Sequence, residues 1–147
     1  MLMVGLWAAE KGGRALWGWP TVFVGMMLFG GVLAMQGTPL PFVEPAILAS
    51  VVALGFLVAL AVDLPIGAGA AVISVFGLFH GHAHGTEVTE TVSGVGYMAG
   101  FALATAALHL LGIGFAELMT HFKLQSAIRV AGMLCVSVGA GLFAGAI

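Results

Sequence analysis

The chain has 147 residues, of which 61% are hydrophobic and only 7% are charged, and its formal net charge is -2. Soluble domains carry about 25% charged residues, and a water-exposed surface depends on that charge. A soluble globular domain is therefore excluded, and we predict an integral membrane protein whose exterior contacts the lipid bilayer. With 4 basic side chains the chain has no basic surface, which excludes a nucleic-acid partner.

Residues 1–9 are apolar but too short to cross a bilayer. They either lie at the membrane interface or are the end of a helix that begins further upstream. Five longer apolar stretches follow, each of about 19–23 residues, a length that spans a hydrocarbon core of about 30 Å. The fold class is all-α: a single polytopic transmembrane helix bundle over residues 1–147, with about five full spans plus an N-terminal partial helix. We place the five spans at residues 16–36, 44–62, 65–85, 94–116 and 127–147.

The positions of the basic residues predict how the bundle is oriented. Lys11 and Arg14 precede the first full span, while Lys123 and Arg129 flank the connection between the last two. Because successive spans alternate in direction, both groups fall on one side of the membrane, which the positive-inside rule assigns to the cytoplasm. Three tryptophans near this side are interpreted as interfacial anchors: Trp7, Trp17 and Trp19.

Several glycines follow the small-xxx-small spacing that lets helix backbones approach closely in lipid. We interpret this spacing as packing between helices of one chain, and a homo-oligomer is the alternative. The glycines concerned are Gly77, Gly81 and Gly85, then Gly96 and Gly100, then Gly141 and Gly145.

The segment FHGHAHGTE, residues 79–87, is the densest polar group in the predicted spans. His80 and His84 are four residues apart and share one helix face, which Glu87 continues, whereas His82 points to nearly the opposite side. Ionisable groups inside a membrane are costly and mark functional sites. Two imidazoles with a carboxylate suit a divalent first-row metal ion. The alternative is that these histidines hydrogen-bond to backbone and water at the helix end.

Two further residues are candidates for the same chemistry. Glu44 begins the second full span, on the side predicted for His80, and could complete the metal site; a carboxylate is also favoured by a helix N-terminus. His109 lies roughly 22 Å into the fourth span. Its separation from His80 along the bundle axis should therefore be well over 10 Å, an estimate from the rise of about 1.5 Å per residue. We interpret His109 as a second station on an ion path, and the alternative is a helix–helix hydrogen bond near Thr105.

Other functional classes lack their motifs in this sequence. The zinc-protease motif HExxH and the nucleotide-binding loop GxxxxGK[ST] are absent, and no Ser/His or Cys/His pair has a convincing spacing. We therefore predict a protein that is not an enzyme, has no prosthetic group and transports without hydrolysing nucleotide itself.

FHGHAHGTE resembles the FHGxAHGxE signature of the HupE/UreJ family, and the similarity continues through VGLWAAEKGGRALW, LPFVE and YMAGFALATAALHLLGIG. The resemblance implies a multi-pass protein of the bacterial inner membrane that carries nickel or cobalt as a secondary permease, in support of hydrogenase or urease maturation. In that membrane, the orientation predicted from the basic residues places the His-rich segment on the periplasmic side. By this resemblance His80, His84 and Glu87 occupy the motif positions, His82 a variable one and Glu44 an acidic one.

One family motif, HxxxxxDH in the first transmembrane helix, lies upstream of the VGLWAA segment and is missing here. The sequence starts at Met1 with MLMVGLWAA, so we expect a fragment or a miscalled start codon, which would also account for the partial helix at residues 1–9.

The competing hypothesis for function is a membrane scaffold or sensor that binds the metal ion without moving it.

Overall fold

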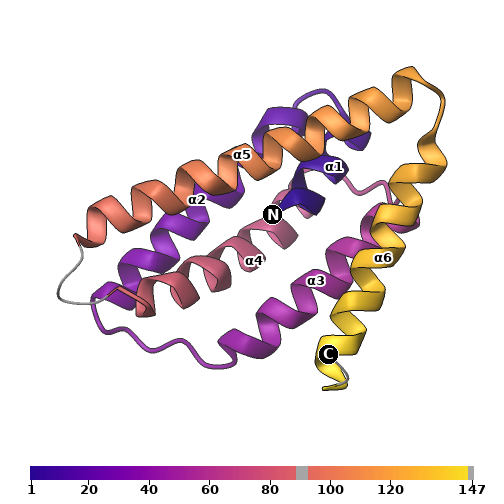
Figure 1. Ribbon diagram of the computed structural model, residues 1–147. Helices are drawn as coiled ribbons and strands as arrows, with labels where there is room; N and C mark the ends of the chain where they lie inside the picture. Colours follow the sequence, from indigo (N-terminus) through magenta and orange to yellow (C-terminus); the bar gives the residue numbers. More distant parts are fainter. Residues whose placement is uncertain (89–92, 146–147) are drawn as a thin grey trace.

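The computed structural model describes residues 1–88 and 93–145, and this part of the chain forms six α-helices without strands (Figure 1). The predicted all-α class, a helical membrane bundle, is confirmed. The helices are α1 (Leu2–Lys11), α2 (Ala15–Met35), α3 (Val43–Ala59), α4 (Ile66–Thr86), α5 (Gly94–His121) and α6 (Gln125–Phe143).

Four of the described helices, α2, α4, α5 and α6, are long and apolar enough to cross a membrane. Helix α3 is apolar but has 17 residues, about 25 Å at 1.5 Å per residue, which is the short end of the spanning range. Helix α5 ends at His121 instead of residue 116, and α6 begins at Gln125 instead of residue 127. The predicted end of the last span, residue 147, lies outside the described residues.

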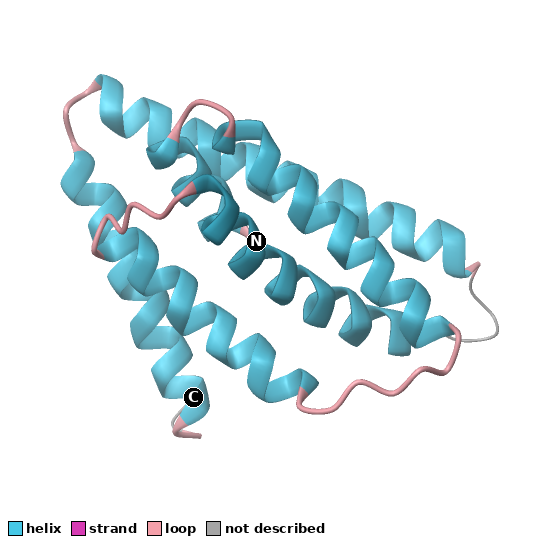
Figure 2. Cartoon of the chain, turned by 180° about the vertical axis from the view of Figure 1, so that it is seen from behind, coloured by secondary structure: helices cyan, strands magenta, loops and turns pink. Residues whose placement is uncertain are grey.

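Helices α2 and α4 pack side by side along their length (Figures 1 and 2). The glycines of α4 make this approach possible, because a Cβ at Gly81 would overlap the carbonyl oxygen of Met27. At Gly85 it would lie 2.5 Å from the carbonyl oxygen of Gly31. The interpretation of this glycine series as packing within the chain is confirmed.

The glycines at the start of α5 behave differently. A Cβ at Gly100 would meet nothing within 4 Å, and one at Gly96 would meet only Ser93 of its own helix. Gly145, beyond the end of α6, is equally open. Packing was therefore the wrong interpretation for these three glycines, because within residues 1–88 and 93–145 the surfaces that carry them face no other helix.

Two other helix pairs also make extensive contacts. Helix α3 packs against α6, where Gly55 lies against Gly132. Helix α1 packs against α5, where a Cβ at Gly5 would overlap the backbone carbonyl of His109. The short first helix thus fixes the backbone of α5 at His109.

Two of the three tryptophans interpreted as interfacial anchors are core residues. Trp7 and Trp19 are each 1% exposed, and their ring centroids are 4.4 Å apart. The indole N–H of Trp7 donates to the carbonyl of Val62, and that of Trp19 donates to Ile66. Because a buried indole needs a hydrogen-bond acceptor, the connection between α3 and α4 supplies one to Trp7, and the first residue of α4 supplies one to Trp19. Trp17 is 59% exposed, as an anchor would be.

The basic residues gather at one end of the bundle. Lys11 pairs with Asp63, and Arg129 pairs with Glu10 at 2.5 Å, which places both predicted basic groups on the same side. A cavity of about 360 Å³ opens there, lined by these four residues and by Glu117. The opposite end holds the last turn of α4 and the first turn of α5.

Candidate metal-binding site

His84 and Glu87 form a hydrogen-bonded pair at the end of α4. The Nδ1 atom of His84 lies 2.9 Å from Oε2 of Glu87, one helical turn away. The hydroxyl of Tyr97, in the first turn of α5, donates to the same oxygen at 2.6 Å and lies 3.4 Å from Nδ1 of His84. The imidazole of His84 also stacks against Phe101, with ring centroids 3.7 Å apart. Two helices therefore hold one imidazole–carboxylate pair.

These contacts change the acidity of the Glu87 carboxyl. The hydrogen bond from Tyr97, and after it the one from His84, lowers the pKa of Glu87 below its usual value. Both donors stabilise the ionised form. The group is therefore a carboxylate that accepts hydrogen bonds, so the Nδ1 atom of His84 is the donor in the pair.

His80 lies one turn before His84 on α4 and is half-buried. Its Nδ1 atom lies 2.9 Å from the carbonyl oxygen of Phe76. A carbonyl oxygen only accepts, so this nitrogen carries the proton and Nε2 of the neutral ring keeps its lone pair. Backbone bonding of this kind was the alternative interpretation of the His-rich segment, but it occupies only one of the two ring nitrogens.

His82 points away from this site, as the helical spacing predicts. It is 6% exposed, and its Nε2 atom donates to the carbonyl of Thr38, in the connection between α2 and α3, at 2.9 Å. His82 therefore ties that connection to α4 and leaves the opposite face to His80 and His84.

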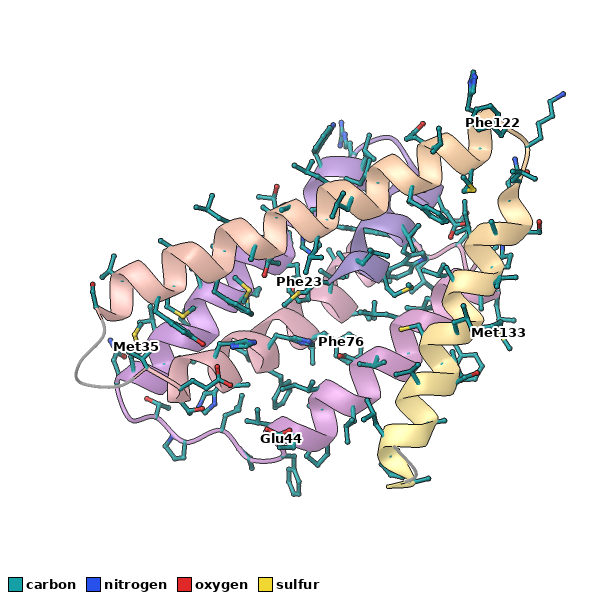
Figure 3. The ribbon with its side chains drawn as sticks, viewed as in Figure 1. Phe23, Met35, Glu44, Phe76, Phe122 and Met133 are labelled. Atoms are coloured by element: carbon teal, nitrogen blue, oxygen red, sulfur yellow. The ribbon has the colours of Figure 1, made fainter. Side chains whose placement is uncertain are left out.

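His109 lies in the core at 1% exposure, and within the described chain neither of its ring nitrogens has a hydrogen-bond partner. The phenyl ring of Phe23 lies between α4 and α5 (Figure 3), with centroid distances of 5.6 Å to His80 and 5.2 Å to His109. The two imidazoles thus contact one ring, and the axial separation predicted from the sequence is too large. The estimate assumed that α5 begins level with the end of α4.

The hydrogen bond expected near Thr105 has a different partner. The hydroxyl of Thr105 donates to the sulfur of Met27 at 3.4 Å, and not to His109. The helix–helix bond is therefore present, but the imidazole does not take part in it.

Glu44 is exposed in the first turn of α3, at the same end of the bundle as the last turn of α4 (Figure 3). Across residues 1–88 and 93–145, no three His, Cys, Asp or Glu side chains lie close enough together to hold a metal ion. The structure brings His84 and Glu87 together, with His80 one turn away, and leaves Glu44 and His109 apart from them.

Tyr97 was not predicted as a site residue. It is the single tyrosine of the chain, and it lies in the first turn of the helix that follows the His-rich segment. That position was the available signal, but the docking of α5 against the end of α4 had to be known before the hydroxyl could be placed on Glu87.

The fold and the site define a polytopic helical membrane protein with paired imidazole and carboxylate groups at one end of its bundle. A family model described as HupE / UreJ protein matches residues 1–142. Protein HupE from Rhizobium leguminosarum bv. viciae is 46% identical over 145 residues, which cover 99% of this chain and 76% of the relative. No solved structure matches the chain. The chain belongs to the HupE/UreJ family of membrane accessory proteins.

Proposed function

We propose that this protein is a secondary carrier of divalent nickel or cobalt across the bacterial inner membrane, in support of hydrogenase or urease maturation. The observation that carries the proposal is the His84–Glu87 pair, 2.9 Å apart at the end of a membrane-spanning helix, with His80 one turn away. Imidazole nitrogens and carboxylates bind divalent first-row metals, and the relative bears the name Protein HupE.

The ion is captured at the site that His80, His84 and Glu87 form together, and the exposed carboxylate of Glu44 at the same end raises the local concentration of cations. His109 serves as a second station in the bundle core, on the far side of Phe23. Imidazole must be neutral to bind a metal ion, so uptake falls as the medium is acidified.

The charged end of the bundle, with Lys11 and Arg129, faces the cytoplasm under the positive-inside rule. The end that holds His84 then faces the periplasm. This orientation places the capture site on the side from which a nutrient cation arrives.

The proposal is tested by uptake of radiolabelled nickel into vesicles that contain the purified chain. We expect His84→Ala and His80→Ala each to abolish the time-dependent, internalised pool, because each removes one imidazole from the capture site. His121→Ala is the matched control, since His121 is exposed at the opposite end. Wild-type rates in the His84→Ala vesicles would refute the proposed site.

The same experiment separates a carrier from a scaffold or sensor. A scaffold would retain nickel on the protein, and the bound amount would neither grow with time nor depend on a sealed vesicle interior. That result would establish the alternative function for the same residues.

A further inference from the structure

We infer that the metal ion is bound through the Nε2 atoms of His80 and His84, and that Glu87 and Tyr97 are positioning residues which orient the His84 ring instead of touching the ion. This inference rests on the proposed function and assigns a role to each group of that site. It also gives a role to Tyr97, for which the helical spacing of the His-rich segment gives no indication.

The first argument concerns which ring nitrogens are available. Nδ1 of His84 donates to Glu87, and Nδ1 of His80 donates to the Phe76 carbonyl. Each neutral ring then has its remaining lone pair on Nε2, so both histidines present the same type of ligand atom. Metal-binding histidines commonly donate their other N–H to a carboxylate or a backbone carbonyl, which fixes the tautomer and the ring orientation. Here His84 donates to a carboxylate and His80 donates to a backbone carbonyl.

The second argument concerns the carboxylate. Oε2 of Glu87 accepts from both His84 and Tyr97, at 2.9 Å and 2.6 Å. A metal ion on this oxygen would compete with both donors. The described residues also contain no third His, Cys, Asp or Glu close enough to form a three-ligand cluster. A small number of protein ligands is appropriate for a cargo ion, because the ion must be released again.

The third argument concerns how α5 contributes. Tyr97 and Phe101 are one turn apart on α5, and they contact Glu87 and the His84 ring respectively. The hydroxyl holds the carboxylate in place, and the phenyl ring restricts the tilt of the imidazole. The orientation of His84 therefore depends on the docking of α5 against the end of α4.

The experiment measures Co²⁺ binding to the detergent-solubilised chain by its visible d–d absorption, whose band positions report the ligand set. We expect Tyr97→Phe to weaken the Co²⁺ affinity by roughly 10-fold, at the lower end of the loss typical for such supporting groups, with unchanged band positions. Glu87→Gln keeps an oxygen that accepts from His84, so it retains the same bands and loses less affinity than Glu87→Ala. His84→Ala moves the bands, because it removes a ligand.

Ser93→Ala is the matched control for Tyr97→Phe. The Ser93 hydroxyl caps α5 by accepting from the backbone of Gly96, so its loss loosens the same helix start without touching the imidazole pair. Wild-type affinity in Tyr97→Phe, or an equal loss in Ser93→Ala, would overturn the role of Tyr97. Shifted bands in Glu87→Gln would make Glu87 a direct ligand and overturn the assignment. If the wild-type chain transports nickel but one of these variant results is found, only this inference fails. If the wild-type chain neither binds Co²⁺ nor takes up nickel, the proposed function fails as well.

Discussion

The imidazole–carboxylate pair at the end of α4 gains its properties from groups on two different helices. His84 and Glu87 are three residues apart, so the helical repeat alone brings them to one face. Tyr97 comes from the next helix and donates to the same carboxylate oxygen. The hydrogen bonds stabilise the ionised carboxylate, which in turn selects the tautomer of the imidazole.

A prediction at this scale concerns the acidity of Glu87. Because the hydrogen bonds hold its pKa below the usual value, the carboxylate keeps its partners as the pH falls, until the pH passes that lowered pKa. Tyr97→Phe removes the donor with the larger effect, so the pKa should rise toward the usual value and the pair should break at a higher pH. The carboxyl carbon shift in ¹³C NMR, followed against pH and assigned with Glu87→Gln, measures this change. An unchanged titration midpoint in Tyr97→Phe would contradict the prediction.

At the scale of helices, close backbone contacts decide where the side chains of the candidate site lie. The contact between Gly81 and the Met27 carbonyl brings α4 onto α2, which places Phe23 beside His80. The contact between Gly5 and the backbone of His109 fixes α5 in the same way. Side chains with a Cβ at these points would force the helices apart, so the arrangement of the imidazoles depends on glycine.

We therefore predict that Gly81→Ala destabilises the protein, by about 1–3 kcal/mol, the usual cost of overpacking a well-packed contact. The added Cβ would overlap the Met27 carbonyl oxygen, and the backbone at that point has little freedom to move. Thermal unfolding in detergent, followed by circular dichroism, measures the loss. Gly100→Ala is the control, because a Cβ there meets nothing within 4 Å. Equal melting temperatures for the two variants would show that the α2–α4 contact is looser than described.

At the scale of the whole molecule, the two ends of the bundle differ in their chemistry. One end holds the two ion pairs and the cavity of about 360 Å³, and the other holds the imidazole–carboxylate pair. The proposed direction of capture depends on which end faces the periplasm.

The orientation can be measured with cysteine labelling in a Cys135→Ser background. We expect Thr38→Cys, which lies in the connection between α2 and α3, to react with a membrane-impermeant maleimide added to intact cells. Ser126→Cys lies at the charged end and should react only after lysis, because the positive-inside rule places it in the cytoplasm. Both positions are exposed in the structure, so the reverse pattern would invert the proposed orientation.

The amino-acid sequence alone established the membrane class, because 61% hydrophobic and 7% charged residues leave lipid as the only compatible surroundings. It also determined that His80, His84 and Glu87 share one face and that His82 faces the opposite side, since the helical repeat is a local property. The family was recognisable from the same residues, because FHGHAHGTE and the segments around it are contiguous in the chain.

The contacts between helices became visible only in the folded chain. The burial of Trp7 and Trp19, the approach of His80 and His109 to one phenyl ring, and the hydrogen bond from Tyr97 to Glu87 all join residues far apart along the chain or across a connection. Their positions depend on where one helix begins relative to another and on how closely the backbones pack. Neither quantity follows from periodicity within a single helix, which is the physical reason that the sequence located the histidines but not their partners.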